Sequence, residues 1–322
     1  AQKTMVLAQQ LYEGIDIQGE GSVGLVTYIR TDSTRVSDGA QKETLDYILS
    51  KYGKEYRPDK PNHFRGKKGA QDAHESIRPT SILRDPDLIK KSLKRDQYRL
   101  YKLIYQRFLA SQMTPAIFET MTITIKGKNY IFRATGSRKI FQGYSIIYEE
   151  GRDDYKEEKD MDLPEVEAGE KVILKKWMPN QHFTQPPPRY TEASLVRTLE
   201  DMGIGRPSTY APTIYTITSR GYVEREKRTL IPTELGFIVN DLMTDYFSDI
   251  VDYQFTAEME EVLDKVEDGE KAWKDIIRDF YPPFKALLDH ADGQIPQIEI
   301  KDEETDVVCD KCGTNMVIKT GR

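Results

Sequence analysis

Hydrophobic positions recur with a helical period in the first 115 residues of the chain. Apolar residues stand every three or four positions in the segments 4–13, 38–52 and 100–113, a spacing that lines one face of an α-helix. Glycines follow the first two segments and favour helix ends there, and Ser37 is a good N-cap for the second. The pattern predicts a helical domain over residues 1–115. The core-facing residues that we expect are Val6, Leu7, Leu11, Ala40, Leu45, Ile48, Leu49, Tyr52, Leu103, Ile104, Phe108 and Leu109.

Between the first two predicted helices, the segment 24–34 has the composition of a short buried strand that ends in polar residues. Successive side chains of a strand point to opposite faces, so Tyr28 and Arg30 should emerge on the same side. A fixed cation beside a phenol favours the phenolate and can also hold an anionic phosphate. The pair is therefore a candidate for nucleophilic chemistry on a phosphate. An ordinary strand tyrosine beside a solvated arginine fits the same pattern.

From residue 116 the pattern changes to one typical of β-structure. The segments 121–125 and 130–133, separated by a polar turn, predict a hairpin, and two further strands are expected at 143–148 and 171–177. The acidic run between them, residues 149–170, is expected to be a solvated loop. These elements predict a β-rich domain over residues 116–187.

Three consecutive prolines at 186–188 form a stiff connector, and a helical pattern resumes after them. Thr191 should cap a helix that ends at Gly203, and a second helix should end at Gly221, before a hairpin over residues 222–232. Helix, helix and hairpin in this order are the layout of a winged-helix domain, in which the second helix commonly meets nucleic acid. A small structural helical domain with a hairpin is the alternative. Three amphipathic helices at 237–246, 257–266 and 272–288 complete a domain over residues 188–292.

Polar residues collect where the second of these helices begins. Arg206, Ser208 and Thr209 stand with free backbone amides at a helix N-terminus, and such a group binds anions. A phosphate of single-stranded DNA is a suitable occupant, and Arg220 at the far end of the helix could extend the track.

The last thirty residues, 293–322, are expected to be an acidic linker and part of a metal-binding motif. Cys309 and Cys312 have the spacing of one half of a zinc site, but a closed tetrahedral site needs four ligands. We therefore expect no complete metal site in this chain.

Charge and composition narrow the function. The net charge of −6 argues against a uniformly basic nucleic-acid binder, although a local basic groove is compatible with acidic outer faces. No apolar run is long enough to span a membrane, and two cysteines fit a reducing cytoplasm. The first residues have no signal-peptide pattern and no initiator methionine, so we expect a cytoplasmic piece of a longer protein. No phosphate loop of the ATP-binding kind occurs in the sequence.

Three separated motifs carry a resemblance to a known family. They are YIRTDST at residues 28–34, QDAHESIRP at 71–79 and GIGRPSTY at 203–210. In this order they resemble the type IA DNA topoisomerases, the family of bacterial DNA topoisomerase I, and the similarity extends over essentially the whole chain. The resemblance implies an α+β multidomain fold with a helical, tyrosine-bearing gate domain, a β-rich arch or hinge and a winged-helix-like domain.

The resemblance also implies a mechanism. Tyr28 would attack a phosphorus of single-stranded DNA and form a 5′-phosphotyrosyl intermediate, with Arg30 holding the phosphate and His74 orienting or protonating groups nearby. Strand passage and religation would then relax negatively supercoiled duplex DNA without ATP. The alternative is that His74 has only a structural role within its own loop.

Other expectations concern partners and cofactors. The family's acidic, Mg²⁺-binding Toprim domain precedes this region, so the Mg²⁺ site should lie outside the chain, and Zn²⁺ would bind only to a complete C-terminal ribbon. We expect a monomer that lies in the cytoplasm with the bacterial nucleoid and is inactive by itself. A non-catalytic winged-helix module that binds nucleic acid or protein is the alternative function.

Overall fold

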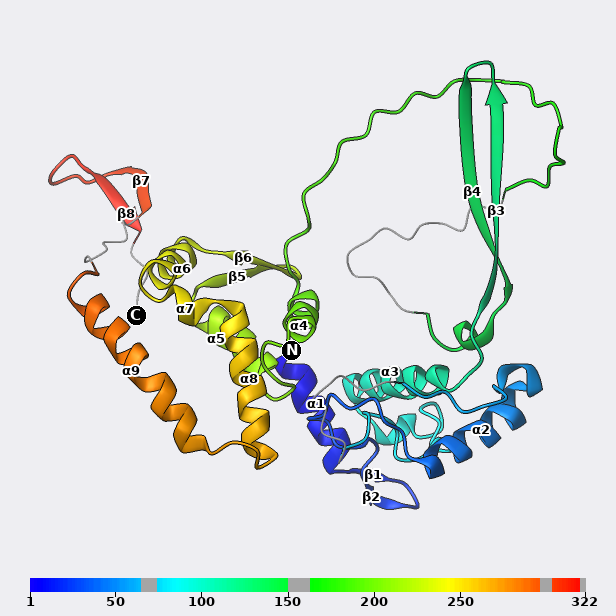
Figure 1. Cartoon of the computed structure of the whole chain (residues 1–322), viewed down its shortest axis with the longest axis horizontal. Helices are drawn as coiled ribbons and strands as arrows, with labels where there is room; N and C mark the ends of the chain where they lie inside the picture. Colours follow the sequence, from blue (N-terminus) through cyan, green and yellow to red (C-terminus); the bar gives the residue numbers. More distant parts are fainter. Residues whose placement is uncertain (65–73, 150–162, 296–302, 319–322) are drawn as a thin grey trace. The chain divides into compact units, whose positions relative to one another are not determined.

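The computed structural model describes residues 1–64, 74–149, 163–295 and 303–318 (Figure 1). The chain divides into two compact units. The N-terminal unit contains Ala1–Arg189 with Pro207–Ala211, and the C-terminal unit contains Tyr190–Arg206 with Pro212–Arg322. Parts of three sequence-based predictions lie outside the described residues: the start of the QDAHESIRP motif, most of the acidic run 149–170, and the middle of the linker. The division into four domains stays a prediction.

Three helices enclose the core of the N-terminal unit, as the sequence predicts. They are α1 (Gln2–Glu13), α2 (Asp38–Tyr52) and α3 (Arg95–Ser111), accompanied by a hairpin of β1 (Ile15–Ile17) and β2 (Gly21–Val23) and the short 3₁₀ helices η1 (Lys54–Tyr56) and η2 (Lys90–Ser92). The core is one cluster of aliphatic and aromatic side chains that are withdrawn from solvent. It contains Leu11, Ile17, Leu25, Val26, Ile29, Ile48, Ile82, Ile89, Tyr101, Tyr105, Phe108, Leu109 and Met113.

The helix faces differ in part from the predicted ones. Val6, Leu49 and Leu103 were expected in the core but are 53%, 44% and 49% exposed. Gln41 is buried instead, and its Nε2 donates a hydrogen bond of 3.0 Å to the Asn62 carbonyl oxygen. Helical spacing marks which residues share a face, but only the packed neighbours decide where the edge of that face lies. A buried glutamine is tolerated because its amide has a partner.

A polar network joins α2 and α3 to the irregular segment that follows the second motif. The Tyr105 hydroxyl donates to the Ile82 carbonyl oxygen at 2.7 Å and lies 3.2 Å from the Tyr47 hydroxyl. Lys51 Nζ donates to the Tyr47 hydroxyl at 2.7 Å and to Asp85 Oδ2 at 2.8 Å. Burial, with the Tyr47 hydroxyl as a further cause, raises the pKa of Tyr105, so its hydroxyl stays a donor at neutral pH.

We expect Tyr105→Phe to lower the free energy of unfolding by about 1–2 kcal/mol, because the buried Ile82 carbonyl loses its donor. Urea denaturation measures this loss. Tyr144→Phe is the matched control, since Tyr144 is 40% exposed and its hydroxyl should contribute little. Equal losses in the two variants would show that the network adds nothing to stability.

A long two-stranded ribbon follows α3 and is drawn in green in Figure 1. β3 (Ile117–Gly127) pairs antiparallel with β4 (Tyr130–Phe141), so the predicted hairpin is confirmed and longer than expected. Lys128 in its turn has a φ of 50°.

The two further strands predicted after this hairpin are wrong. Residues Gly143–Ile146 form the 3₁₀ helix η3, and the segment 171–177 has no regular structure. Gly143 has a φ of 48°, and a Cβ there would meet the Pro115 carbonyl oxygen at 2.4 Å, so this turn requires glycine, and its left-handed φ is not that of a strand. Segment 171–177 pairs with no strand among the residues that the structure describes, and Ile173 is 88% exposed.

The C-terminal unit begins with the elements of the predicted winged-helix layout. α4 (Glu192–Asp201) starts at Thr191, whose Oγ1 accepts a hydrogen bond of 3.1 Å from the Ser194 amide, as an N-cap should. α5 (Tyr210–Ser219) and the hairpin of β5 (Val223–Glu226) and β6 (Thr229–Pro232) follow. The Leu230 amide donates to the Tyr190 carbonyl oxygen at 2.7 Å, which fixes the hairpin to the start of α4.

Four more helices and a second hairpin complete this unit. The helices are α6 (Glu234–Tyr246), α7 (Ser248–Val251), α8 (Tyr253–Glu267) and α9 (Trp273–Asp292), so the three predicted amphipathic helices are confirmed. The hairpin pairs β7 (Glu303–Val308) with β8 (Asn315–Ile318), so the segment predicted to be a linker ends inside a strand. No helix in the described ranges is long and apolar enough to cross a membrane.

Candidate active site

The segment that carries Tyr28 is extended but is not a strand, which corrects the sequence-based prediction. It forms one isolated β-bridge, between Val26 and Pro79. The Thr27 amide donates to the Arg78 carbonyl oxygen at 3.0 Å, and the chain bends at Ile29. A strand needs a ladder of such bonds, and here the partner segment turns away after one bridge.

Burial alternates at the reactive end of this segment, whereas the emergence of Tyr28 and Arg30 on the same side stays a prediction. Ile29 is 5% exposed and belongs to the core, whereas Tyr28 is 39% exposed and Arg30 is also exposed. The side chains of Tyr28 and Arg30 are therefore both accessible to solvent, and the buried Ile29 stands between them in the sequence.

Two aromatic rings contact Tyr28. The Tyr12 ring, at the end of α1, lies edge-on with its centroid 5.6 Å from that of Tyr28, and the His74 ring lies 5.2 Å away on the other motif. The structure thus brings together the predicted site residues Tyr28 and His74. Sequence reasoning missed Tyr12, whose only signal is its place directly after the buried Leu11 on the same helix. Such ring contacts restrict the orientation of a side chain that is otherwise free to rotate.

Hydrogen bonds hold the two motifs in register beside these rings. Thr27 Oγ1 donates to the Ser76 carbonyl oxygen at 2.7 Å and accepts a hydrogen bond of 2.9 Å from the Arg78 amide. The Ser76 amide donates to the Arg35 carbonyl oxygen at 2.8 Å. His74 precedes this anchored stretch by two residues, so its position relative to Tyr28 depends on these bonds.

An ion pair that the sequence analysis did not single out supports the second motif. Arg78 Nε donates to Glu75 Oε2 at 2.7 Å, and its Nη1 donates to the Pro79 carbonyl oxygen at 2.9 Å. Burial alone would raise the pKa of Glu75, but the hydrogen bond and charge of Arg78 outweigh it and hold this pKa below its ordinary value. Arg78 Nη2 also lies 3.4 Å from Ser37 Oγ, and Ser37 makes no side-chain cap to α2 although it occupies the N-cap position.

The residues of the predicted anion site belong to different units, because the boundary between the two units lies between Arg206 and Pro207. Arg206 is therefore described separately from Ser208 and Thr209. Arg206 Nη2 donates to Asp264 Oδ2 at 2.6 Å, and Nη1 lies 3.8 Å from Glu260 Oε2. Ser208, Thr209 and Arg220 are exposed. A role for these residues in binding phosphates stays a prediction, and Arg206 would have to exchange carboxylate partners for a phosphate.

The two cysteines lie in the turn between β7 and β8. The Gly313 amide donates to the Cys309 carbonyl oxygen at 2.9 Å, and Cys312 Sγ lies 3.0 Å from Thr314 Oγ1. The hydrogen bond with Thr314 lowers the pKa of the Cys312 thiol, which favours the metal-binding thiolate form. Within the described ranges no group of three or more histidine, cysteine or acidic side chains could hold a metal ion. The described residues therefore provide neither a Mg²⁺ site nor a closed Zn²⁺ site.

Comparison with known proteins agrees with the motifs. Residues 1–278 match the family model described as DNA topoisomerase. The chain is also similar to the solved structure of full-length topoisomerase I from Thermotoga maritima in a monoclinic crystal form, with a TM-score of 0.78 and 39% sequence identity. That match covers 100% of this chain and 51% of the solved chain, so this chain spans about half the length of its relative.

Proposed function

Because the chain belongs to the type IA DNA topoisomerase family, we propose that Tyr28 is the nucleophile that transiently cleaves one strand of DNA. The Tyr28 oxygen attacks a backbone phosphorus, a P–O bond to Tyr28 forms, and the bond between phosphorus and the 3′ oxygen breaks. The phenol proton leaves to a base, and the 3′ oxygen takes up a proton. The intermediate keeps the free energy of the phosphodiester, so religation needs no ATP.

The residues around Tyr28 have separate parts in this proposal. Arg30 binds the scissile phosphate and stabilises the charge that develops on its oxygens. His74, in contact with the Tyr28 ring, orients the phenol or moves a proton. Arg206, Ser208, Thr209 and Arg220 bind strand phosphates. Mg²⁺ in this family supplies charge stabilisation at the phosphate, and its ligands would come from outside the described residues.

One observation supports the proposal best: the Tyr28 phenol is exposed and its ring contacts both Tyr12 and His74. The exposed Arg30 follows it two residues later in the sequence. A structural tyrosine would more often be buried or bound through its hydroxyl. In the wider proposal, residues 1–115 move as the gate, the β-rich segment 116–187 is its arch and hinge, and the substrate is negatively supercoiled DNA in the bacterial cytoplasm.

A trapping assay tests the function directly. The chain is mixed with a labelled single-stranded oligonucleotide and the family's Toprim domain, supplied as a separate polypeptide with Mg²⁺, and the mixture is denatured rapidly. We expect a covalent adduct whose tryptic map places the nucleotide on the peptide containing Tyr28. An adduct on another residue, or none under conditions where a full-length type IA enzyme forms one, would favour the non-catalytic winged-helix module.

Arg30→Lys should keep DNA binding but slow adduct formation by about tenfold or more, because lysine retains the charge and loses the planar pair of donors. Rapid-quench measurement of the adduct gives the rate, and fluorescence anisotropy gives the affinity. Arg35→Lys, at an exposed arginine five residues further along the chain, is the control. Cleavage at the wild-type rate by Arg30→Lys would refute the phosphate-binding role.

Arg206→Ala should weaken binding of single-stranded DNA several-fold at low salt and reduce the salt dependence of binding, since each phosphate contact releases a counterion. Asp264→Asn is the paired variant: it removes the carboxylate that now holds Arg206 and should strengthen binding. Anisotropy across a salt series measures both. Unchanged affinity in the two variants would exclude Arg206 from the DNA path.

A further inference from the structure

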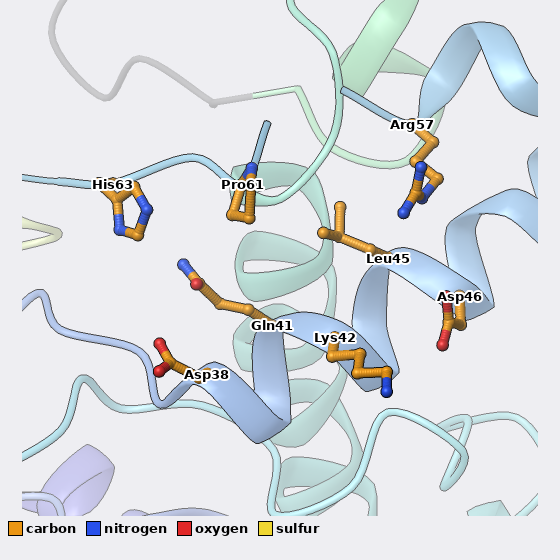
Figure 2. A pocket seen from close by; sticks show the side chains of 8 residues that line it. All are labelled: Asp38, Gln41, Lys42, Leu45, Asp46, Arg57, Pro61 and His63. Atoms are coloured by element: carbon orange, nitrogen blue, oxygen red, sulfur yellow. The ribbon is translucent and has the colours of Figure 1, made fainter. Parts of the chain in front are cut away.

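A cavity of about 290 Å³ lies on the N-terminal unit, between the first half of α2 and the segment 57–63 (Figure 2). Neither Tyr28 nor His74 lines it. Its inner surface includes Leu45, which is 6% exposed, and Gln41, which is 4% exposed. The cavity is therefore separate from the residues proposed for cleavage and has an apolar floor.

Both walls of this cavity are fixed by hydrogen bonds of their own. Gln41 Nε2 donates to the Asn62 carbonyl oxygen at 3.0 Å, which joins α2 to the segment 57–63. Asn62 Nδ2 donates in turn to the carbonyl oxygens of Ser111 at 2.9 Å and Met113 at 3.0 Å. A site with preformed walls loses little conformational entropy when it takes up a ligand.

One buried donor at the cavity lacks an acceptor. Arg57 Nε is withdrawn from solvent and has no hydrogen-bond partner among the described residues. Figure 2 shows Arg57 reaching from its segment toward α2. Arg57 as a whole is only partly buried, but a buried side-chain N–H such as its Nε nearly always has a partner, and a guanidinium can only donate. The complementary group is therefore an acceptor, and a carboxylate or phosphate oxygen matches its charge.

Charged side chains of both signs stand at the rim of the cavity. Asp38, Lys42 and Asp46 are spaced four residues apart on α2, so they share one face of the helix, and all three are exposed. None of them forms an ion pair within the part of the chain that the structure describes. The lining thus offers carboxylates that attract an ammonium group, together with the cations Lys42 and Arg57 that attract an anionic one.

We propose that this cavity binds a small zwitterion, with an oxyanion on Arg57, an ammonium group at Asp46, and an apolar chain over Leu45. The size of the cavity suits a ligand of amino-acid dimensions. The proposal does not depend on cleavage by Tyr28. It assigns the N-terminal unit a second site, for a class of ligand different from a DNA strand.

Isothermal titration calorimetry of the full chain tests this with ω-amino carboxylates from glycine to 6-aminohexanoate. Acetate, which has only the carboxylate, and ethylammonium, which has only the ammonium group, serve as half-ligands for comparison. We expect one chain length to bind at least about tenfold more tightly than either half-ligand. Arg57→Leu should weaken that binding by about tenfold or more, whereas Asp46→Asn should weaken the amino carboxylate and leave acetate unchanged. Arg99→Leu, an exposed arginine on α3, is the matched control.

Three results would overturn the proposal. They are acetate binding as tightly as every amino carboxylate, Arg57→Leu binding like the wild type, and displacement of the ligand by a single-stranded oligonucleotide, which would make Arg57 a phosphate contact. If Arg57→Leu does not fold by circular dichroism, Arg57→Lys replaces it, because lysine keeps the charge and lacks the buried Nε donor. A fourth result, absence of binding by every probe, would also overturn the proposal.

Discussion

Replacing Tyr28 by phenylalanine should abolish the covalent DNA adduct and all relaxation of supercoiled DNA that depends on it. The substitution removes one oxygen, the atom proposed to attack phosphorus, and no other group can take its place in the linkage. Removing a nucleophile from a comparable catalytic group reduces the rate by at least about ten-thousand-fold. The adduct of Tyr28→Phe should therefore fall below detection on a denaturing gel.

The fold of this variant should be intact. The phenylalanine ring can keep both ring contacts, with Tyr12 at 5.6 Å and with His74 at 5.2 Å. Tyr12→Phe is the matched control, because it removes a hydroxyl from the neighbouring ring and should leave the adduct in place. An adduct that persists in Tyr28→Phe, or disappears equally in Tyr12→Phe, would move the nucleophile elsewhere.

The second large effect is expected on stability. Arg78→Ala should lower the free energy of unfolding by about 2–3 kcal/mol, between the values typical of exposed and of buried ion pairs. The side chains of Arg78 and Glu75 are only 12% and 24% exposed, so alanine leaves the Glu75 carboxylate partly buried without its cation. It also removes the hydrogen bond to the Pro79 carbonyl oxygen. Chemical denaturation at neutral pH measures the loss.

The pH dependence gives this prediction a second readout. The pKa of Glu75 in the folded chain lies below its ordinary value of 4.5, so the pair stabilises the fold fully above that value. The contribution is lost as the pH falls through the lowered pKa, because Glu75 is then protonated in both states. The difference between wild type and Arg78→Ala should therefore shrink below about pH 4.5.

Arg84→Ala provides the control for this experiment. Arg84 Nε donates to Glu20 Oε2 at 2.9 Å, with side chains 25% and 44% exposed, so its loss should be about 1 kcal/mol or less. A loss in Arg78→Ala no greater than this would show that the pair does not hold the second motif. Because that motif carries His74, Arg78→Ala should also slow adduct formation in the trapping assay.

The sequence by itself determined most elements and singled out Tyr28 as the side chain that we propose to be the nucleophile. The periodic spacing of α1, α2 and α3 and the alternation in the ribbon predict those elements correctly, since burying one face requires only residues that are near in sequence. A phenol and a guanidinium two residues apart are compatible with phosphate chemistry, and the resemblance of the motif around Tyr28 to the family favours that interpretation. The comparisons then establish the family.

Only the tertiary structure decided which distant groups meet. Tyr12 comes from the end of α1 to contact Tyr28, and the Val26 segment forms a single bridge, with Pro79, because its partner bends at Thr80. The apolar segment 171–177 has a strand's composition but no paired neighbour, so it forms no strand. Arg206 lies against Asp264, 58 residues away in sequence, where sequence alone suggested a cation available for phosphate. Each outcome depends on a pairing between remote segments, and local composition does not specify such pairings.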